Sequence, residues 1–210
     1  EVQADTICRV LEVAGRARIP AVGFIESAGA RLQEGVAALR GYGRIFNAHT
    51  QLSGQVPQIS VICGASAGGS SYAPALTDVV VMTKQASMFL TGPGVVRDVL
   101  GEDVDAAQLG GPRVHERNGV AQFVVPDDLA AAALARELLE YLPQSLHDTP
   151  TLQVPALPVA GDPGDVVPSE SRRVYDVRDV IARIADRGDL LEYGPRWARN
   201  MVTAFGRIDG

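Results

Sequence analysis

Two short runs of glycine, alanine and serine hold the groups in this sequence that are best suited to chemistry. They are residues 26–31, Glu-Ser-Ala-Gly-Ala-Arg, and residues 64–71, Gly-Ala-Ser-Ala-Gly-Gly-Ser-Ser. Each follows an apolar segment that predicts a buried strand, residues 19–25 and 58–63, and each precedes a predicted helix. Side chains this small let a ligand reach backbone N–H groups, and the N–H groups at a helix start have no intrahelical partner. Turns of this kind can hold an oxyanion without a charged side chain.

The second run contains a glycine pair, Gly68 and Gly69, whose N–H groups an acyl oxygen can approach closely because neither residue has a Cβ. If the two strands are parallel neighbours, both runs lie at the carboxyl edge of one sheet, where open parallel sheets bind ligands. The alternative is structural, a glycine pair that only lets a helix pack tightly against a strand. Because each run follows a predicted buried strand, we expect the two turns to form one site.

The same residues fit a second chemistry, because residues 64–68 match the G-x-S-x-G pattern of serine hydrolases, with Ser66 as the nucleophile. That mechanism needs an acid and a later histidine. His115 lies in a predicted polar loop, where we expect a solvated side chain, and His147 lies at the edge of a proline-rich stretch. Neither place favours a rigid catalytic base, so the oxyanion hypothesis is preferred and the hydrolase remains the alternative.

Helical and strand patterns alternate along the first 142 residues. This order predicts βαβ units and therefore an α/β fold with a largely parallel sheet. The predicted helices span residues 3–17, 36–50, 69–76, 95–100 and 127–141, with Asp127 or Asp128 as N-cap of the last, and the predicted strands span residues 19–25, 58–63, 78–83, 87–91 and 123–125.

The amino-acid composition changes at residues 143–171. This stretch contains six prolines and predicts an interdomain linker. Beyond it, only a helix near residues 177–184 and a strand at 201–208 are predicted, too little for a core of their own. Residues 172–210 therefore read as the beginning of a second domain. The chain opens in the middle of a helical pattern without an initiator Met, so we expect a piece of a longer protein.

Composition excludes several classes of function. The net charge is −6 with acids and bases interspersed, and the single Trp offers little for stacking, so no nucleic-acid partner is expected. No apolar stretch is long enough to span a membrane, and no signal peptide is evident. Cys8 and Cys63 match no metal-binding spacing, so we expect no metal and a cytoplasmic protein with reduced thiols.

Taken together, these motifs resemble the carboxyltransferase, or β, subunit of biotin-dependent acyl-CoA carboxylases of the propionyl- and acetyl-CoA carboxylase type. Many matching segments occur in the same order, which makes a chance match improbable. They are residues 26–35, 56–60, 67–69, 72–78, 91–93, 101–104, 167–173 and 205–207.

The resemblance implies the crotonase superfamily fold of stacked ββα units. Residues 1–142 would be the later part of the N-terminal carboxyltransferase domain, and 172–210 the opening of the C-terminal one. It also implies transfer of a carboxyl group from carboxybiotin to the α-carbon of a short acyl-CoA. The amides of Gly68 and Gly69 would form the oxyanion hole, and the substrate would be bound by Ala28, Gly29, Ala30 and Ala67.

Cofactor and partners follow from the same resemblance. Biotin would arrive as carboxybiotin on a biotin carboxylase or biotin carboxyl carrier subunit, and the protein would form a dimer-based homo-oligomer, commonly a hexamer. In this family the biotin released from carboxybiotin takes the α-proton, so no side-chain base is needed. A decarboxylase of the same fold and a non-catalytic module that binds CoA thioesters remain as further alternatives.

Overall fold

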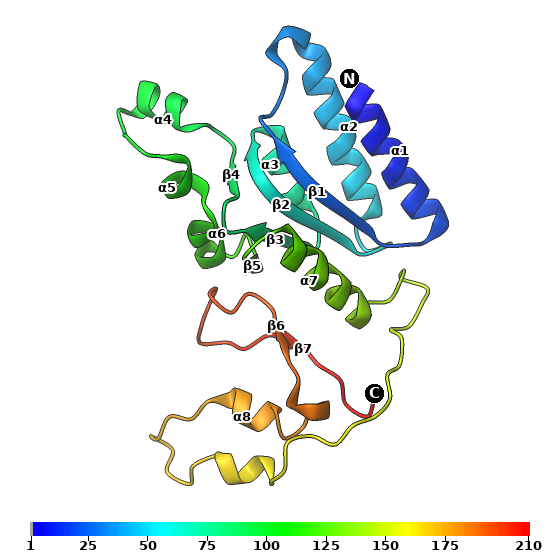
Figure 1. Cartoon of the computed structure of the whole chain (residues 1–210), viewed down its shortest axis with the longest axis vertical. Coiled ribbons are helices and arrows are strands. Elements are labelled where there is room, and N and C mark those ends of the chain that lie inside the picture. The colour runs from blue at the N-terminus through cyan, green and yellow to red at the C-terminus, as the bar shows by residue number, and fades with distance from the viewer. Residues whose placement is uncertain (1) are drawn as a thin grey trace. The chain divides into compact units, whose positions relative to one another are not determined.

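The computed structural model describes residues 2–210. They form two compact units, a first that ends at Pro150 and a second that comprises Thr151–Gly210 (Figure 1). The first unit contains both glycine-rich runs, so the following paragraphs treat it in more detail.

The first unit is built on a five-stranded sheet in which every recorded strand pair is parallel. Strands β1 (Ala21–Ser27), β2 (Gln58–Ala67), β3 (Val79–Thr83) and β5 (Phe123–Val125) lie in that order, and β4 (Ser87–Phe89) pairs with the end of β2. The predicted parallel α/β fold is confirmed. Because β1 and β2 are neighbours, both glycine-rich runs leave the sheet at the same edge.

The core lies along the two central strands. Val61 and Ile62 of β2 and Val81 and Met82 of β3 have no exposed surface, and each of these two strands has a neighbour on both sides. On β1, whose only partner among the described residues is β2, the Phe24 side chain is half-exposed.

Three long helices pack around this sheet. Helices α1 (Val2–Ala17) and α2 (Val36–Leu52) run side by side next to β1 and β2 (Figure 1), and α7 (Asp128–Tyr141) contacts β2, β3 and β5. The Asp127 carboxylate accepts a hydrogen bond from the Ala130 N–H at 2.9 Å, which confirms Asp127 as the N-cap of α7.

Two predicted boundaries at the second run were wrong. Strand β2 continues four residues past Cys63 because its residues Ala65–Ala67 pair with β4. The helix expected to reach residue 76 is broken into α3 (Gly69–Tyr72) and the 3-10 turn η2 (Pro74–Leu76), since Pro74 has no N–H to continue it.

The polar loop predicted around His115 was also wrong, because this stretch is helical. Helix α4 (Pro93–Leu100) is followed by α5 (Ala106–Gly110) and α6 (Pro112–Asn118). Asp105 caps α5 together with Gln108, and α6 starts on a proline and ends at Gly119 with φ 83°. Short helices of this kind, like the 3-10 turn η1 (Leu32–Glu34), give little periodic signal.

The second unit contains little regular structure. It holds α8 (Val177–Ile181), the 3-10 turns η3 (Pro163–Val166) and η4 (Asp186–Gly188), and the antiparallel pair β6 (Leu191–Glu192) and β7 (Ala204–Phe205). The strand predicted at residues 201–208 is only two residues long, since only Ala204 and Phe205 pair with β6. The sequence did not reveal that partner. No helix of the described residues is long and apolar enough to cross a membrane.

We predict that acid destabilises the second unit partly through Asp186. Its carboxylate accepts hydrogen bonds from the N–H groups of Gly210 at 2.8 Å and Asp209 at 3.0 Å, which hold the pKa of Asp186 below its ordinary value. A lowered pKa in the folded state means stability that is present above the unfolded pKa of about 3.9 and is lost as the pH falls further. Urea unfolding followed by Trp197 fluorescence between pH 2 and 6 should therefore show a shallower acid dependence in Asp186→Asn.

The matched control is Asp165→Asn, because Asp165 is an exposed carboxylate in the same unit that accepts no hydrogen bond from any residue the structure describes. It should keep the wild-type acid dependence. Equal slopes for Asp186→Asn and the wild type would contradict the role given to Asp186.

Candidate functional site

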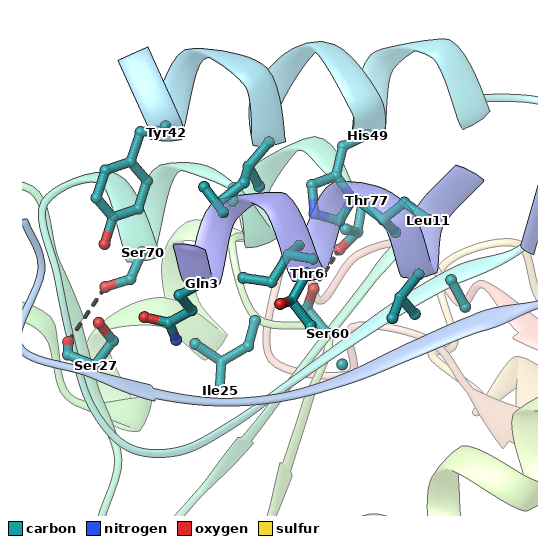
Figure 2. A pocket seen from close by; sticks show the side chains of 18 of the residues that line it. Gln3, Thr6, Leu11, Ile25, Ser27, Tyr42, His49, Ser60, Ser70 and Thr77 are labelled. Carbon is teal, nitrogen blue, oxygen red and sulfur yellow. Dashed lines mark hydrogen bonds between the residues drawn. The ribbon is translucent and has the colours of Figure 1, made fainter. Parts of the chain in front are cut away.

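The structure brings the two glycine-rich runs into direct contact. A Cβ added to Gly29 would lie 2.8 Å from the Ala67 carbonyl oxygen, so the first run approaches the end of β2 as closely as backbone allows. Gly29 also has a φ of 95°, which favours glycine. The Ser70 Oγ accepts a hydrogen bond from the Ala67 N–H at 3.0 Å and lies 3.2 Å from the Ser27 carbonyl oxygen, so it joins the two runs (Figure 2).

Only one amide of the predicted glycine pair is open to a ligand. The Gly68 N–H donates a hydrogen bond to the Phe89 carbonyl oxygen at 2.9 Å, which continues the pairing of β2 with β4. Gly68 has φ 61° and ψ −126°, a conformation that an L side chain rarely adopts. The expectation that Gly68 offers its N–H to an oxyanion is therefore wrong in this structure, since that donor is already used.

Gly69 differs from its neighbour. It is the first residue of α3, and its N–H donates to no other group among residues 2–210. The residue as a whole is half-buried. The aromatic ring of Tyr42 from α2 covers its Cα so tightly that an added Cβ would lie 2.5 Å from a ring carbon.

The first run supplies further donors beside Gly69. The N–H of Gly29 donates to the Ser27 Oγ at 3.2 Å, whereas those of Ala28 and Ala30 meet no acceptor in the described part of the chain. The corner formed by residues 28–30, Ala67 and Gly69 thus offers several backbone donors and no charged side chain of its own. Such an arrangement suits an oxygen atom that carries partial negative charge.

A cavity of about 1170 Å³ lies between α1, α2 and β1 and reaches this corner. Gly29 and Ala30 line it, as do Ser70 and Tyr42, whose hydroxyl points toward Ser70 in Figure 2. The structure does not place the other predicted site residues, which are Ala28, Ala67, Gly68 and Gly69, on the wall of this cavity.

The serine-hydrolase alternative is contradicted by the position of Ser66. Its side chain is completely buried within β2, and its Oγ lies 3.4 Å from the hydroxyls of Ser70 and Ser71. His115 uses its Nε2 on the Met88 carbonyl, and His147 is exposed near the end of the first unit. A nucleophile must reach its substrate and its base, and Ser66 reaches neither.

Cys63 is not a nucleophile in this site either. Burial raises the pKa of its thiol, and the neighbouring Asp128 and Glu26 carboxylates raise the pKa further. The thiol therefore stays protonated at neutral pH.

Sequence reasoning missed the side chains that hold the corner together. The Ser71 Oγ accepts a hydrogen bond from the Phe89 N–H at 3.1 Å and donates to the Ser66 carbonyl at 2.6 Å, while Ser70 joins the two runs. These two serines directly follow the glycine pair in the sequence, and that position could have marked them as candidates for this role. The part played by Tyr42 depends on how α2 packs on α3, which no local pattern reveals.

The family model of the carboxyl transferase domain matches residues 1–210 of this sequence. The chain belongs to the carboxyl transferase domain family. The resemblance drawn from the motifs is thereby confirmed.

Three relatives show the range of the family. The methylmalonyl-CoA carboxyltransferase 12S subunit of Propionibacterium freudenreichii subsp. shermanii is 46% identical over 213 residues, which cover 100% of this chain and 41% of that protein. The methylmalonyl-CoA decarboxylase subunit alpha of Propionigenium modestum is 42% identical over 221 residues, an alignment that covers 100% of this chain and 42% of that protein. A biotin-dependent acetyl-/propionyl-coenzyme A carboxylase beta6 subunit of Mycobacterium bovis is 45% identical over 91% of this chain and 40% of that protein.

The fold is shared as well. The crystal structure of transcarboxylase 12S, with hydrolysed methylmalonyl-coenzyme A bound, superimposes with a TM-score of 0.96 over 100% of this chain and 42% of that one. This match confirms the predicted carboxyltransferase, crotonase-like fold. The chain spans about two fifths of the length of the relatives it matches.

We predict that Gly69→Ala is destabilising, because the new Cβ would lie 2.5 Å from the Tyr42 ring and rigid ring atoms must then move. Overpacking of this kind costs about 1–3 kcal/mol in the free energy of unfolding. Gly43→Ala is the matched control, since Gly43 lies exposed within α2 and its added Cβ meets nothing within 4 Å. Chemical denaturation should show Gly43→Ala to be more stable than the wild type by about 0.5–1 kcal/mol. Equal stabilities of the two variants would contradict the contact with Tyr42.

Proposed function

We propose that this chain is the acyl-CoA half of the active site of a cytoplasmic carboxyltransferase, in which a carboxyl group moves from carboxybiotin to the α-carbon of a short acyl-CoA. The observation that carries the proposal is the N–H of Gly69 at the start of α3, which meets no acceptor among residues 2–210, together with the open N–H groups of Ala28 and Ala30 in the adjoining run. Membership of the carboxyl transferase domain family supports it.

The main work of these residues is to hold negative charge on the thioester oxygen. When the α-proton leaves, the electron pair of the C–H bond forms the enolate, and charge accumulates on that oxygen. The Gly69 N–H donates to it, and the N–H groups of Ala28 and Ala30 are the candidates for a second donor from the first run. One well-aimed donor of this kind is worth about 3–4 kcal/mol in the transition state.

Carboxybiotin would supply the carboxyl group and, after losing it, the base that takes the α-proton. The residues of the corner agree with a base that comes from biotin. The backbone of glycine, alanine and serine can bind an oxyanion but cannot remove a carbon-bound proton. No residue described here is assigned to biotin, which we expect to be delivered by a biotin carboxyl carrier subunit.

We further propose that the protein works as a homo-oligomer built from dimers, as a hexamer. The 12S relative is described as a hexamer assembly and multienzyme core. Apolar side chains on and beside α4 support an assembled state, since Leu90, Val95, Val99 and Leu100 are all more than half exposed.

A decarboxylase is the second candidate function, and one of the three relatives is a methylmalonyl-CoA decarboxylase subunit. The same amide would stabilise the same enolate in either direction. Assays of carboxyl gain by propionyl-CoA and carboxyl loss by methylmalonyl-CoA, each with and without a carboxylatable biotin carrier, separate the two candidates.

We predict that Gly69→Pro lowers kcat for carboxyl transfer about 10²–10³-fold, because it deletes the N–H that holds the enolate oxygen. Proline is tolerated at the first position of a helix, so the loss is one of a donor rather than of the helix. Gly69→Ala is the matched control, since it adds a Cβ against Tyr42 and keeps the N–H. Transfer of a labelled carboxyl group to propionyl-CoA measures both, and equal kcat values for the folded variants would contradict the proposal.

For Ser66→Ala we predict little change in carboxyl transfer, because the buried hydroxyl lies against the hydroxyls of Ser70 and Ser71 in the interior of the first unit. A fluorophosphonate probe should likewise fail to label the wild-type protein at Ser66. Covalent labelling there, or a near-complete loss of turnover in Ser66→Ala, would restore the hydrolase interpretation.

A further inference from the structure

Strand β4 is held from both of its edges. On the inner edge, the Phe89 N–H donates to the Ser71 Oγ at 3.1 Å, and the Phe89 carbonyl accepts the Gly68 N–H at 2.9 Å. On the outer edge, where the described residues place no further strand, the Met88 carbonyl lies 2.6 Å from the His115 Nε2. The imidazole thus takes the place of a missing neighbouring strand.

The neighbours of the ring determine which nitrogen carries the proton. The Asn118 Oδ1 accepts the Val120 N–H at 3.1 Å, which turns the Asn118 Nδ2 toward the His115 Nδ1 at 3.4 Å. An amide NH2 is only a donor, so Nδ1 must accept. The proton therefore sits on Nε2 and is donated to Met88, whose carbonyl can only accept.

The residues around this hydrogen bond are tightly packed. A Cβ on Gly110, at the end of α5, would lie 2.1 Å from the Met88 carbonyl oxygen and 3.2 Å from the His115 Nε2. Both the helix and the ring therefore approach β4 at the closest distance that backbone permits. Since β4 is only three residues long, each of its few hydrogen bonds carries a large share of its placement.

We propose that His115 is a positioning residue for the oxyanion site. By donating Nε2–H to Met88 it fixes β4 against β2, so that the Phe89 carbonyl meets the Gly68 N–H and Gly68 keeps its φ of 61°. That conformation in turn aims the open N–H of Gly69. The consequence for turnover rests on the proposed function, whereas the consequence for the Gly68 hydrogen bond does not.

The test compares His115→Gln with His115→Leu. The Gln amide nitrogen reaches about as far as the imidazole Nε2 and can donate to Met88, whereas Leu fills the space without a donor. We expect amide hydrogen exchange at Gly68 to be slow in the wild type and in His115→Gln, and faster in His115→Leu. Turnover in the full protein should fall about 10–100-fold in His115→Leu, with KM little changed, because small misplacements of a catalytic group cost that much.

The matched control is His147→Leu, which removes an exposed imidazole in the same unit and should leave both readouts at the wild-type value. Wild-type exchange at Gly68 in folded His115→Leu would overturn the proposal, and so would an equal loss in His115→Gln and His115→Leu. If the wild type shows no carboxyl transfer at all, the proposed function fails, but the exchange measurement still decides the role of His115.

A measurement on the unaltered protein covers the case in which His115→Leu does not fold. The ¹⁵N shifts of the His115 ring should show a protonated Nε2 and an unprotonated Nδ1. A proton on Nδ1, or two tautomers in exchange, in the wild type would overturn the proposal.

Discussion

The hydrogen bond from the Gly68 N–H to the Phe89 carbonyl determines which backbone group of this site is available for chemistry. It consumes one donor of the glycine pair, and it holds Gly68 at a φ that few other residues tolerate. The chain then enters α3 with a Gly69 N–H that has no acceptor in the described part of the chain. A site that uses backbone donors depends on such restraint, because a flexible turn would lose part of its stabilisation to reorganisation during the reaction.

Local sequence predicted much of the scaffold. The apolar segments before each glycine-rich run, and their alternation with helical patterns, were enough for a parallel α/β sheet with both runs at one edge. The six predicted site residues lie in two runs that do touch, through Gly29 and Ala67. The distinction between Gly68 and Gly69 could not be predicted, because it depends on β4, a three-residue strand about twenty positions further along the sequence.

Two errors have the same physical origin. Ser66 was placed in a turn after a strand that ends at Cys63, but β2 continues to Ala67 by pairing with β4, and Ser66 is buried within it. His115 was read as a solvated loop residue, but α5 and α6 place its ring against the Met88 carbonyl. In both cases a long-range contact with β4 overrides the structure that the neighbouring residues suggest. Strand β4 is only three residues long and gives little periodic signal in the sequence, yet it has a large effect on the site.

Amide hydrogen exchange at the two adjacent glycines, followed by NMR with and without a CoA thioester, tests the central claim most directly. The account predicts slow exchange at Gly68 in both states, and fast exchange at Gly69 that slows when the thioester binds. Equal protection of the two amides in the free protein, or a thioester that changes exchange at Gly68 and not at Gly69, would contradict it.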